Sequence, residues 1–246
     1  MNNLTDIINK RMSRRDFTKT ALSFSALSVM PFNIQSCTSV EDIKSNMQVA
    51  RGYDVQTVIR WGDPILPGGE NFDPHNYTAR KQMLQFGYNC DYIAYLPING
   101  SSEHGLLCVN HETAITELMV PDITINKSLI DIEMAAHGHS VVEVKKIKGK
   151  WKTVTDSKYN RRITGFTEIG ISGPAAAQIG TSCIGTLNNC GGGKTPWGTL
   201  LICEENFNQY FTSPDSRHKS YNIGSRSRYK WQRAYPRFAA PNEAYK

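Results

Sequence analysis

The chain has 246 residues, of which 39% are hydrophobic and 20% are charged, and its formal net charge is +6. This composition supports a folded core and excludes an intrinsically disordered chain, and the absence of any run of 18 apolar residues predicts no membrane-spanning helix. The positive charge is concentrated in residues 1–37 and 216–246, whereas the segment between them holds fifteen basic and nineteen acidic residues, so the basic balance characterises the two ends rather than the body.

Residues 1–37 are predicted to be an export signal. The segment 13–19, SRRDFTK, resembles a twin-arginine motif, and a weakly apolar run follows over residues 20–32. The alternative is a basic amphipathic helix of the mature protein. The segment 34–37, IQSC, also resembles a lipoprotein cleavage box, which leaves two hypotheses open for Cys37: a lipid-modified residue that tethers the protein to a membrane, or an ordinary residue of an exported, periplasmic protein.

From residue 38 onward the pattern favours a mainly β fold. Short β-rich runs alternate with glycine and proline, and only two short helices are expected, at residues 79–86 and around 127–134. The run 141–147, followed by Gly149, Lys150 and Trp151, predicts a hairpin. The predicted strands are 55–61, 91–96, 105–109, 140–147, 151–154, 162–165, 185–187 and 199–203.

The cysteines fall into different settings. Cys108 and Cys203 lie in apolar runs and are predicted to be small buried core residues. Cys190 instead lies in the segment 188–198, NNCGGGKTPWG, where glycine permits sharp turns and close approach of the backbone to a ligand. The end of this segment resembles a phosphate-binding loop, but the first glycine of that motif is missing and a β run follows in place of a helix. We therefore reject a nucleotide-binding loop.

A shared metal site is the more specific interpretation of Cys190. Thirteen residues later the strand 199–203 ends in Glu204 and Glu205, and a thiolate and a carboxylate at one edge can hold the same ion. The run ending in Glu112 resembles the run ending in Glu205, with an offset of 93 residues, about two propeller blades of ~40–50 residues each. The alternatives are an inert thiol at Cys190 and solvated glutamates at two unrelated strand ends.

Several segments together resemble PhoX-type alkaline phosphatases, and they occur in the same order along the chain. They are YNCDY at 88–92, SEHGLL at 102–107, NHE at 110–112, AHGHSV at 136–141, NRRITG at 160–165, SGPAA at 172–176, GTLNNC at 185–190, and TPWGT to EENF at 195–207. The resemblance extends from the signal to the last residue. It implies a six-bladed β-propeller with an iron (Fe³⁺) and calcium (Ca²⁺) cluster that hydrolyses small-molecule phosphate monoesters at alkaline pH.

The resemblance also implies site residues. Cys190 matches a cysteine that is an iron ligand in the family, and a glutamate of the segment 203–206 is expected to be another ligand, with Glu205 favoured over Glu204 by its offset from Glu112. We expect Cys190 and Glu205 to act in catalysis through the metal, with Glu204 and Glu112 as further metal-ligand candidates. Full-length family members are longer monomers whose remaining blades supply further ligands of the cluster, so residues 38–246 are expected to form an incomplete, N-terminal part of the all-β propeller.

Two other functions remain to be weighed. A propeller part with an incomplete cluster can serve as a non-catalytic binding or scaffold protein. The segment 226–235, RSRYKWQRAY, interleaves basic and aromatic residues as single-strand binders do, but an exported protein meets little nucleic acid, and we expect none as a partner. His104, His111, His137 and His139 are interpreted as hydrogen-bonded residues at strand ends, with metal ligation as the alternative.

Overall fold

The computed structural model describes residues 49–120 and 124–240. The predicted export signal, with Cys37, lies outside these residues. The chain divides into two units, residues 1–54 and 55–246. Of the first unit the structure describes residues 49–54, which form a turn closed by a 3.1 Å hydrogen bond from Tyr53 N to Ala50 O. The elements below belong to the second unit.

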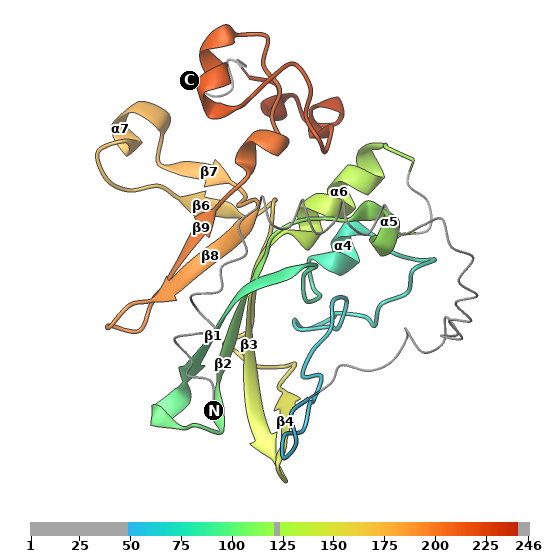
Figure 1. Cartoon of the computed structure of the whole chain (residues 1–246), viewed down its shortest axis with the longest axis vertical. Coiled ribbons are helices and arrows are strands. Elements are labelled where there is room, and N and C mark those ends of the chain that lie inside the picture. The colour runs from blue at the N-terminus through green and yellow to red at the C-terminus, as the bar shows by residue number, and fades with distance from the viewer. Residues whose placement is uncertain (1–48, 121–123, 241–246) are drawn as a thin grey trace, which may run out of the picture. The chain divides into compact units, whose positions relative to one another are not determined.

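An antiparallel sheet forms the centre of the second unit (Figure 1). Its strands are β1 (Cys90–Pro97), β2 (His104–His111), β3 (Gly138–Ile147), β4 (Lys150–Thr153) and β5 (Arg161–Ile163). They pair in the order β1-β2-β3-β4, and β5 pairs with β3. The predicted hairpin is confirmed as β3–β4: Ile147 pairs with Lys150, and Lys148 and Gly149 both have positive φ, as a two-residue hairpin turn requires.

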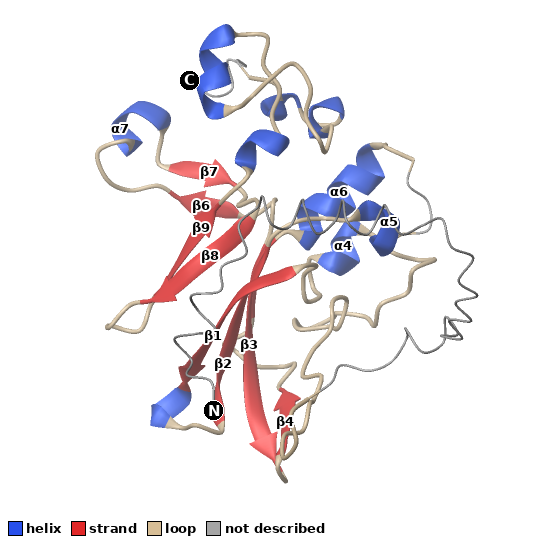
Figure 2. Ribbon diagram, viewed as in Figure 1, coloured by secondary structure: helices blue, strands red, loops and turns tan. Residues whose placement is uncertain are grey.

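Two smaller antiparallel sheets follow along the chain (Figure 2). One pairs β6 (Glu168–Gly170) with β7 (Ser182–Ile184), and the other pairs β8 (Asn189–Lys194) with β9 (Leu200–Glu204). The expectation of a mainly β fold with few short helices agrees with this architecture at the level of antiparallel sheets. The sheets of the described residues are separate from one another, and they form no closed ring or barrel.

The helices are short, apart from α6 (Lys127–Ala136). The side chain of Asn126 caps the start of α6 by accepting a 2.9 Å hydrogen bond from Leu129 N, and most of the helix is buried. The other helices are α4 (Ala79–Gln82), α5 (Thr116–Met119) and α7 (Ala176–Ile179), with the 3₁₀ turns η1 (Ile98–Gly100), η2 (Phe207–Gln209), η3 (Ser216–Tyr221), η4 (Trp231–Arg233) and η5 (Pro236–Phe238). Among the described helices, none combines the length and apolar character needed to cross a membrane.

Two hydrophobic clusters fill the interior of the second unit. The larger one packs α6 against the aromatic residues of the C-terminal segment, with Tyr210 and Trp231 fully buried at its centre. The smaller one lies on the main sheet and includes Phe86, Val109 and Val142. Two aromatic rings of the segment 226–235, Tyr229 and Trp231, are buried in this larger cluster.

Three sequence predictions are wrong in detail. Residues 55–61 form no strand, because the side chain of Gln56 takes the place of a strand partner at Trp151, accepting from its N–H at 2.9 Å and donating to its carbonyl at 2.7 Å. Residues 185–187 form no strand, since Gly185 has a φ of 86° and its backbone packs against Gly165. Cys203 is exposed rather than buried, because β9 belongs to a two-stranded sheet with little packed over it.

Candidate metal centre

Cys190 is positioned by a bulge in β8. Asn189 pairs with Glu204 and Gly192 pairs with Ile202, so Cys190 and Gly191 together face the single residue Cys203. The glycine-rich segment is thus a strand, and the prediction of a turn there is wrong; the turn comes later, at residues 195–199, where Thr195 N bonds to Thr199 O. A bulge bends its strand and redirects the side chain that it carries, here the thiol of Cys190.

The glycines of β8 permit close packing against β1. A Cβ atom on Gly192 would lie 2.5 Å from the ring of Tyr92, a distance that no side chain tolerates. β8 can therefore lie beside β1 only if this residue has no side chain. The close contact brings the bulge to the start of β1, where Asp91 lies.

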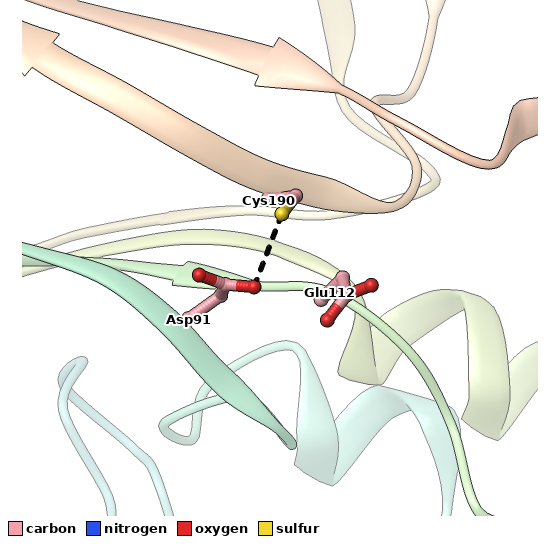
Figure 3. Close-up of side chains that lie close together, drawn as sticks. All are labelled: Asp91, Glu112 and Cys190. Atoms are coloured by element: carbon pink, nitrogen blue, oxygen red, sulfur yellow. Dashed lines mark hydrogen bonds between the residues drawn. The ribbon is translucent and has the colours of Figure 1, made fainter. Parts of the chain in front are cut away.

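Asp91, Glu112 and Cys190 converge on one point (Figure 3), and one ligand atom from each lies within 4.8 Å of the others. Cys190 Sγ donates a hydrogen bond to Asp91 Oδ2 at 3.2 Å. The two carboxylates meet because β1 and β2 are antiparallel and Cys90 pairs with His111, which places Asp91 at the beginning of one strand next to Glu112 just past the end of the other. The backbone N–H of Glu112 also donates to Asn89 O at 3.0 Å.

Glu205 is the fourth acidic group of the site. Hydrogen bonds to Glu205 and Asp91 raise the pKa of the Cys190 thiol to about 12. Burial, followed by the negative charges of Asp91 and Glu205, raises the pKa of Glu112, and the charge of Arg228 opposes this effect. Cys190 and Glu112 thus hold their protons more tightly because negative charge is crowded around them, and a bound cation would relieve this crowding.

Glu204 has a different role from its neighbour. Its Oε1 accepts a 2.7 Å hydrogen bond from Leu187 N and so fastens β9 to the segment that precedes β8. Glu205 donates its own backbone N–H to Asn188 O at 3.0 Å, and its carboxylate faces Cys190. The geometry therefore separates two glutamates that the sequence leaves as alternatives.

The donor set suits a metal centre of mixed character. A thiolate is a ligand for iron or zinc, and carboxylates bind hard cations such as ferric iron and calcium. Of the sequence candidates, the structure brings Cys190, Glu112 and Glu205 together and turns Glu204 away. Sequence reasoning missed Asp91, whose only signal was its place at the start of a predicted strand, within the segment 88–92.

The four histidines that the sequence offers as candidates have hydrogen-bond partners outside the cluster. His104 bonds to Glu143 at 2.7 Å, His111 to Ser140 at 2.7 Å, and His139 to Asn110 at 2.8 Å. His137 bonds through one ring nitrogen to Glu133 O and through the other to Tyr210 Oη. Burial lowers the pKa of His137 and of His139 to about 4, which keeps both rings neutral at physiological pH. In the described residues they act as hydrogen-bonding groups of the interior.

Comparison with known proteins places this geometry in a family context. The family described as alkaline phosphatase PhoX matches residues 34–246. A solved structure, Pseudomonas fluorescens PhoX in complex with vanadate, a transition state analogue, is similar with a TM-score of 0.72 and 36% sequence identity. The similarity covers 77% of this chain and 36% of that one, so the chain spans little more than a third of the length of its structural relative. No curated protein matches the chain.

Proposed function

Because the chain belongs to the PhoX alkaline phosphatase family, we propose that it takes part in the hydrolysis of phosphate monoesters at alkaline pH. The observation that carries the proposal is the convergence of Asp91, Glu112 and Cys190, with Glu205 bonded to the same thiol. The structural relative was solved with vanadate, described there as a transition state analogue, and its 36% sequence identity to the chain over the aligned part supports phosphoryl chemistry here.

We propose that these four residues hold iron and calcium ions. A thiolate beside several carboxylates offers one soft and several hard ligands, which fits a site shared by these two metals. Metal ions at such a site, when bound, neutralise phosphoryl oxygens and supply or activate the nucleophile. The protein's own contribution is to keep the ligands converged before substrate arrives: β1, β2 and β8 each deliver one group to the same point.

The acid-base state of the ligands is part of this proposal. Cys190 shares its proton with the neighbouring carboxylates in the absence of a cation, so metal binding must release that proton. Alkaline conditions favour the release, which makes metal loading stronger as the pH rises.

The wider architecture and location are also proposals. Residues 38–246 would form the N-terminal part of a six-bladed propeller, with Glu112 and Glu205 as equivalent strand-end residues of different blades. Residues 1–37 would direct export of the folded protein to the periplasm through the twin-arginine pathway, with a lipid on Cys37 as an additional anchor. Small-molecule phosphate esters would be the substrates.

Hydrolysis of a chromogenic phosphate monoester tests the proposal. The exported chain is assayed at alkaline pH with calcium, with a chelator, and with vanadate, beside the variants Cys190→Ala and Cys183→Ala. Cys183 is a matched control because it is a free, exposed cysteine on β7, outside the cluster. We expect turnover that chelator, vanadate and Cys190→Ala each abolish and that Cys183→Ala retains. Chelator-insensitive turnover, or full activity in Cys190→Ala, would contradict the proposed site; metal binding without turnover would favour the binding or scaffold alternative.

A further inference from the structure

Asn110 connects the main sheet to the bulge that carries Cys190. It lies on β2, two residues before Glu112 and opposite His139 of β3, and its side chain is fully buried. Its Nδ2 atom donates to Cys190 O at 2.7 Å and to Gly191 O at 3.1 Å. These two carbonyls belong to the two residues that form the bulge, so one side chain holds both.

The orientation of this amide is fixed by its partners. Backbone carbonyls only accept hydrogen bonds, so the NH₂ group of Asn110 must face Cys190 and Gly191. Its Oδ1 atom then faces His139 Nδ1, 2.8 Å away, and this ring nitrogen must carry the proton. Both Nδ2 and Oδ1 of Asn110 therefore have hydrogen-bond partners. If the carboxamide were rotated by 180°, its Oδ1 atom would face the carbonyl oxygens of Cys190 and Gly191, which cannot donate.

The consequence concerns the direction of the Cys190 thiol. A bulge has more than one backbone arrangement, and each arrangement points its side chain differently. Asn110 lies on β2 and bonds to both carbonyls of the bulge. Glu112 directly follows β2, so the same strand positions both the Cys190 thiol and the Glu112 carboxylate. Gly191 has open space where a Cβ atom would lie, so packing at that residue does not fix the bulge.

We propose that Asn110 is a positioning residue that fixes the bulge of β8, so that the Cys190 thiol faces Asp91 and Glu112 and can bind a metal ion. The inference rests on the proposed function, in which Cys190 is a metal ligand. Asn110 contacts no metal in this proposal and acts only through the backbone of Cys190 and Gly191. Asparagine fits the position because it supplies two donors and one acceptor at this length, whereas aspartate supplies no donor.

Cobalt(II) titration of the whole chain tests the proposal, because a cobalt–thiolate bond gives a charge-transfer absorption in the near ultraviolet that carboxylate ligation does not give. The variant is Asn110→Ala, and the matched control is Asn160→Ala. Asn160 is also buried, and its amide likewise bridges backbone groups, donating to Ile65 O, Val154 O and Thr155 O and accepting from Glu143 N, away from the cluster.

Both variants are expected to lower the urea midpoint, since both lose buried hydrogen bonds. Only Asn110→Ala should weaken cobalt binding, by about 10–100-fold in Kd, and remove the charge-transfer band, as outer-shell substitutions at metal sites do. If Asn110→Ala does not fold, Asn110→Ser keeps one donor and should show a smaller loss of the same band. An unchanged band and Kd in a folded Asn110 variant, or an equal loss in Asn160→Ala, would overturn the positioning role alone. Absence of the band in the wild type would overturn the proposed metal site, and the inference with it.

Discussion

Arg162 is expected to be the polar residue on which the fold around the site depends most. Its guanidinium is enclosed by backbone carbonyls: Nη2 donates to Ala135, Ala136 and His137 at 2.7, 3.0 and 2.8 Å, and Nε donates to Gln85 at 3.0 Å. The last carbonyls of a helix have no partner within the helix, so Arg162 caps the C-terminal end of α6. Burial lowers the pKa of the guanidinium to about 9.

The substitution Arg162→Met keeps much of the length of the side chain and removes all its donors. Tyr88 N also donates to Ala136 O, so we count the carbonyls of Ala135, His137 and Gln85 as the three groups left facing an apolar chain. A buried polar group without a partner costs about 1–3 kcal/mol, so three such groups give a loss of about 3–9 kcal/mol in the free energy of unfolding. That is a large part of the stability of an ordinary domain, about 5–15 kcal/mol.

Urea denaturation followed by tryptophan fluorescence measures this loss, and Arg161→Met is the matched control. Arg161 is the preceding residue, but its side chain is exposed and its bonds to Lys158 O and Tyr159 O are long, at 3.2 and 3.3 Å. Water replaces such donors, so Arg161→Met should leave the urea midpoint unchanged. Equal midpoints for the two variants would refute the assignment of Arg162 as the cap of α6.

Three further outcomes are expected. Glu205→Gln should weaken cobalt binding at least tenfold, because its carboxylate faces Cys190. Glu204→Gln should leave cobalt binding nearly unchanged, because its glutamine oxygen can still accept from Leu187 N; the reverse order would exchange the two roles. Stability should fall as the pH drops from 6.5 towards 4, because His137 and His139 have folded pKa values of about 4 and unfolded histidine titrates near 6.5. The unfolded chain therefore binds more protons than the folded chain over that range, and each histidine lowers the free energy of unfolding by up to about 1.4 kcal/mol for each pH unit of acidification. Urea midpoints that do not change between pH 6.5 and 4 would contradict the neutral, buried state of the rings. Gly138→Ala should lower the free energy of unfolding by about 3 kcal/mol or more, since φ is 106° and the new Cβ would lie 2.1 Å from Ile163 O. Gly149→Ala, where φ is also positive but the space is open, should lower it by about 1–2 kcal/mol. Similar urea midpoints for the two variants would exclude the clash at Gly138.

The parts of the fold with a strong local signal were predictable. The strands β1, β2 and β3 follow apolar runs, and the hairpin β3–β4 has the turn residues Lys148 and Gly149 between two such runs. The predicted strand at residues 55–61 is wrong because a side chain, rather than a strand backbone, bonds to the edge of the sheet. Gln56 bonds to Trp151 as a neighbouring strand would, and nothing in the local pattern distinguishes this from a true strand.

The sequence predicts which types of residue form the candidate site, but not how they are arranged. Cys190 and the two strand-end glutamates were accessible from the motifs, but Asp91 joins them only through the pairing of Cys90 with His111, which no local pattern reveals. The choice between Glu204 and Glu205 likewise depends on which carboxylate turns back to Leu187. Arg161 and Arg162 are adjacent and identical in the sequence, and only the packing against α6 makes one of them a buried cap.

The central claim is that Asp91, Glu112, Cys190 and Glu205 form one metal centre. The most direct test is the metal content of the purified whole chain, measured by mass spectrometry of the elements, for the wild type, Asp91→Asn and Asp131→Asn. Asp131 is the control because it lies on α6, outside the cluster, and its carboxylate accepts hydrogen bonds from Lys127 and Tyr235. Bound iron is expected in the wild type and in Asp131→Asn, with a loss of at least about tenfold in Asp91→Asn. Equal iron in all three proteins, or none in the wild type, would contradict that claim.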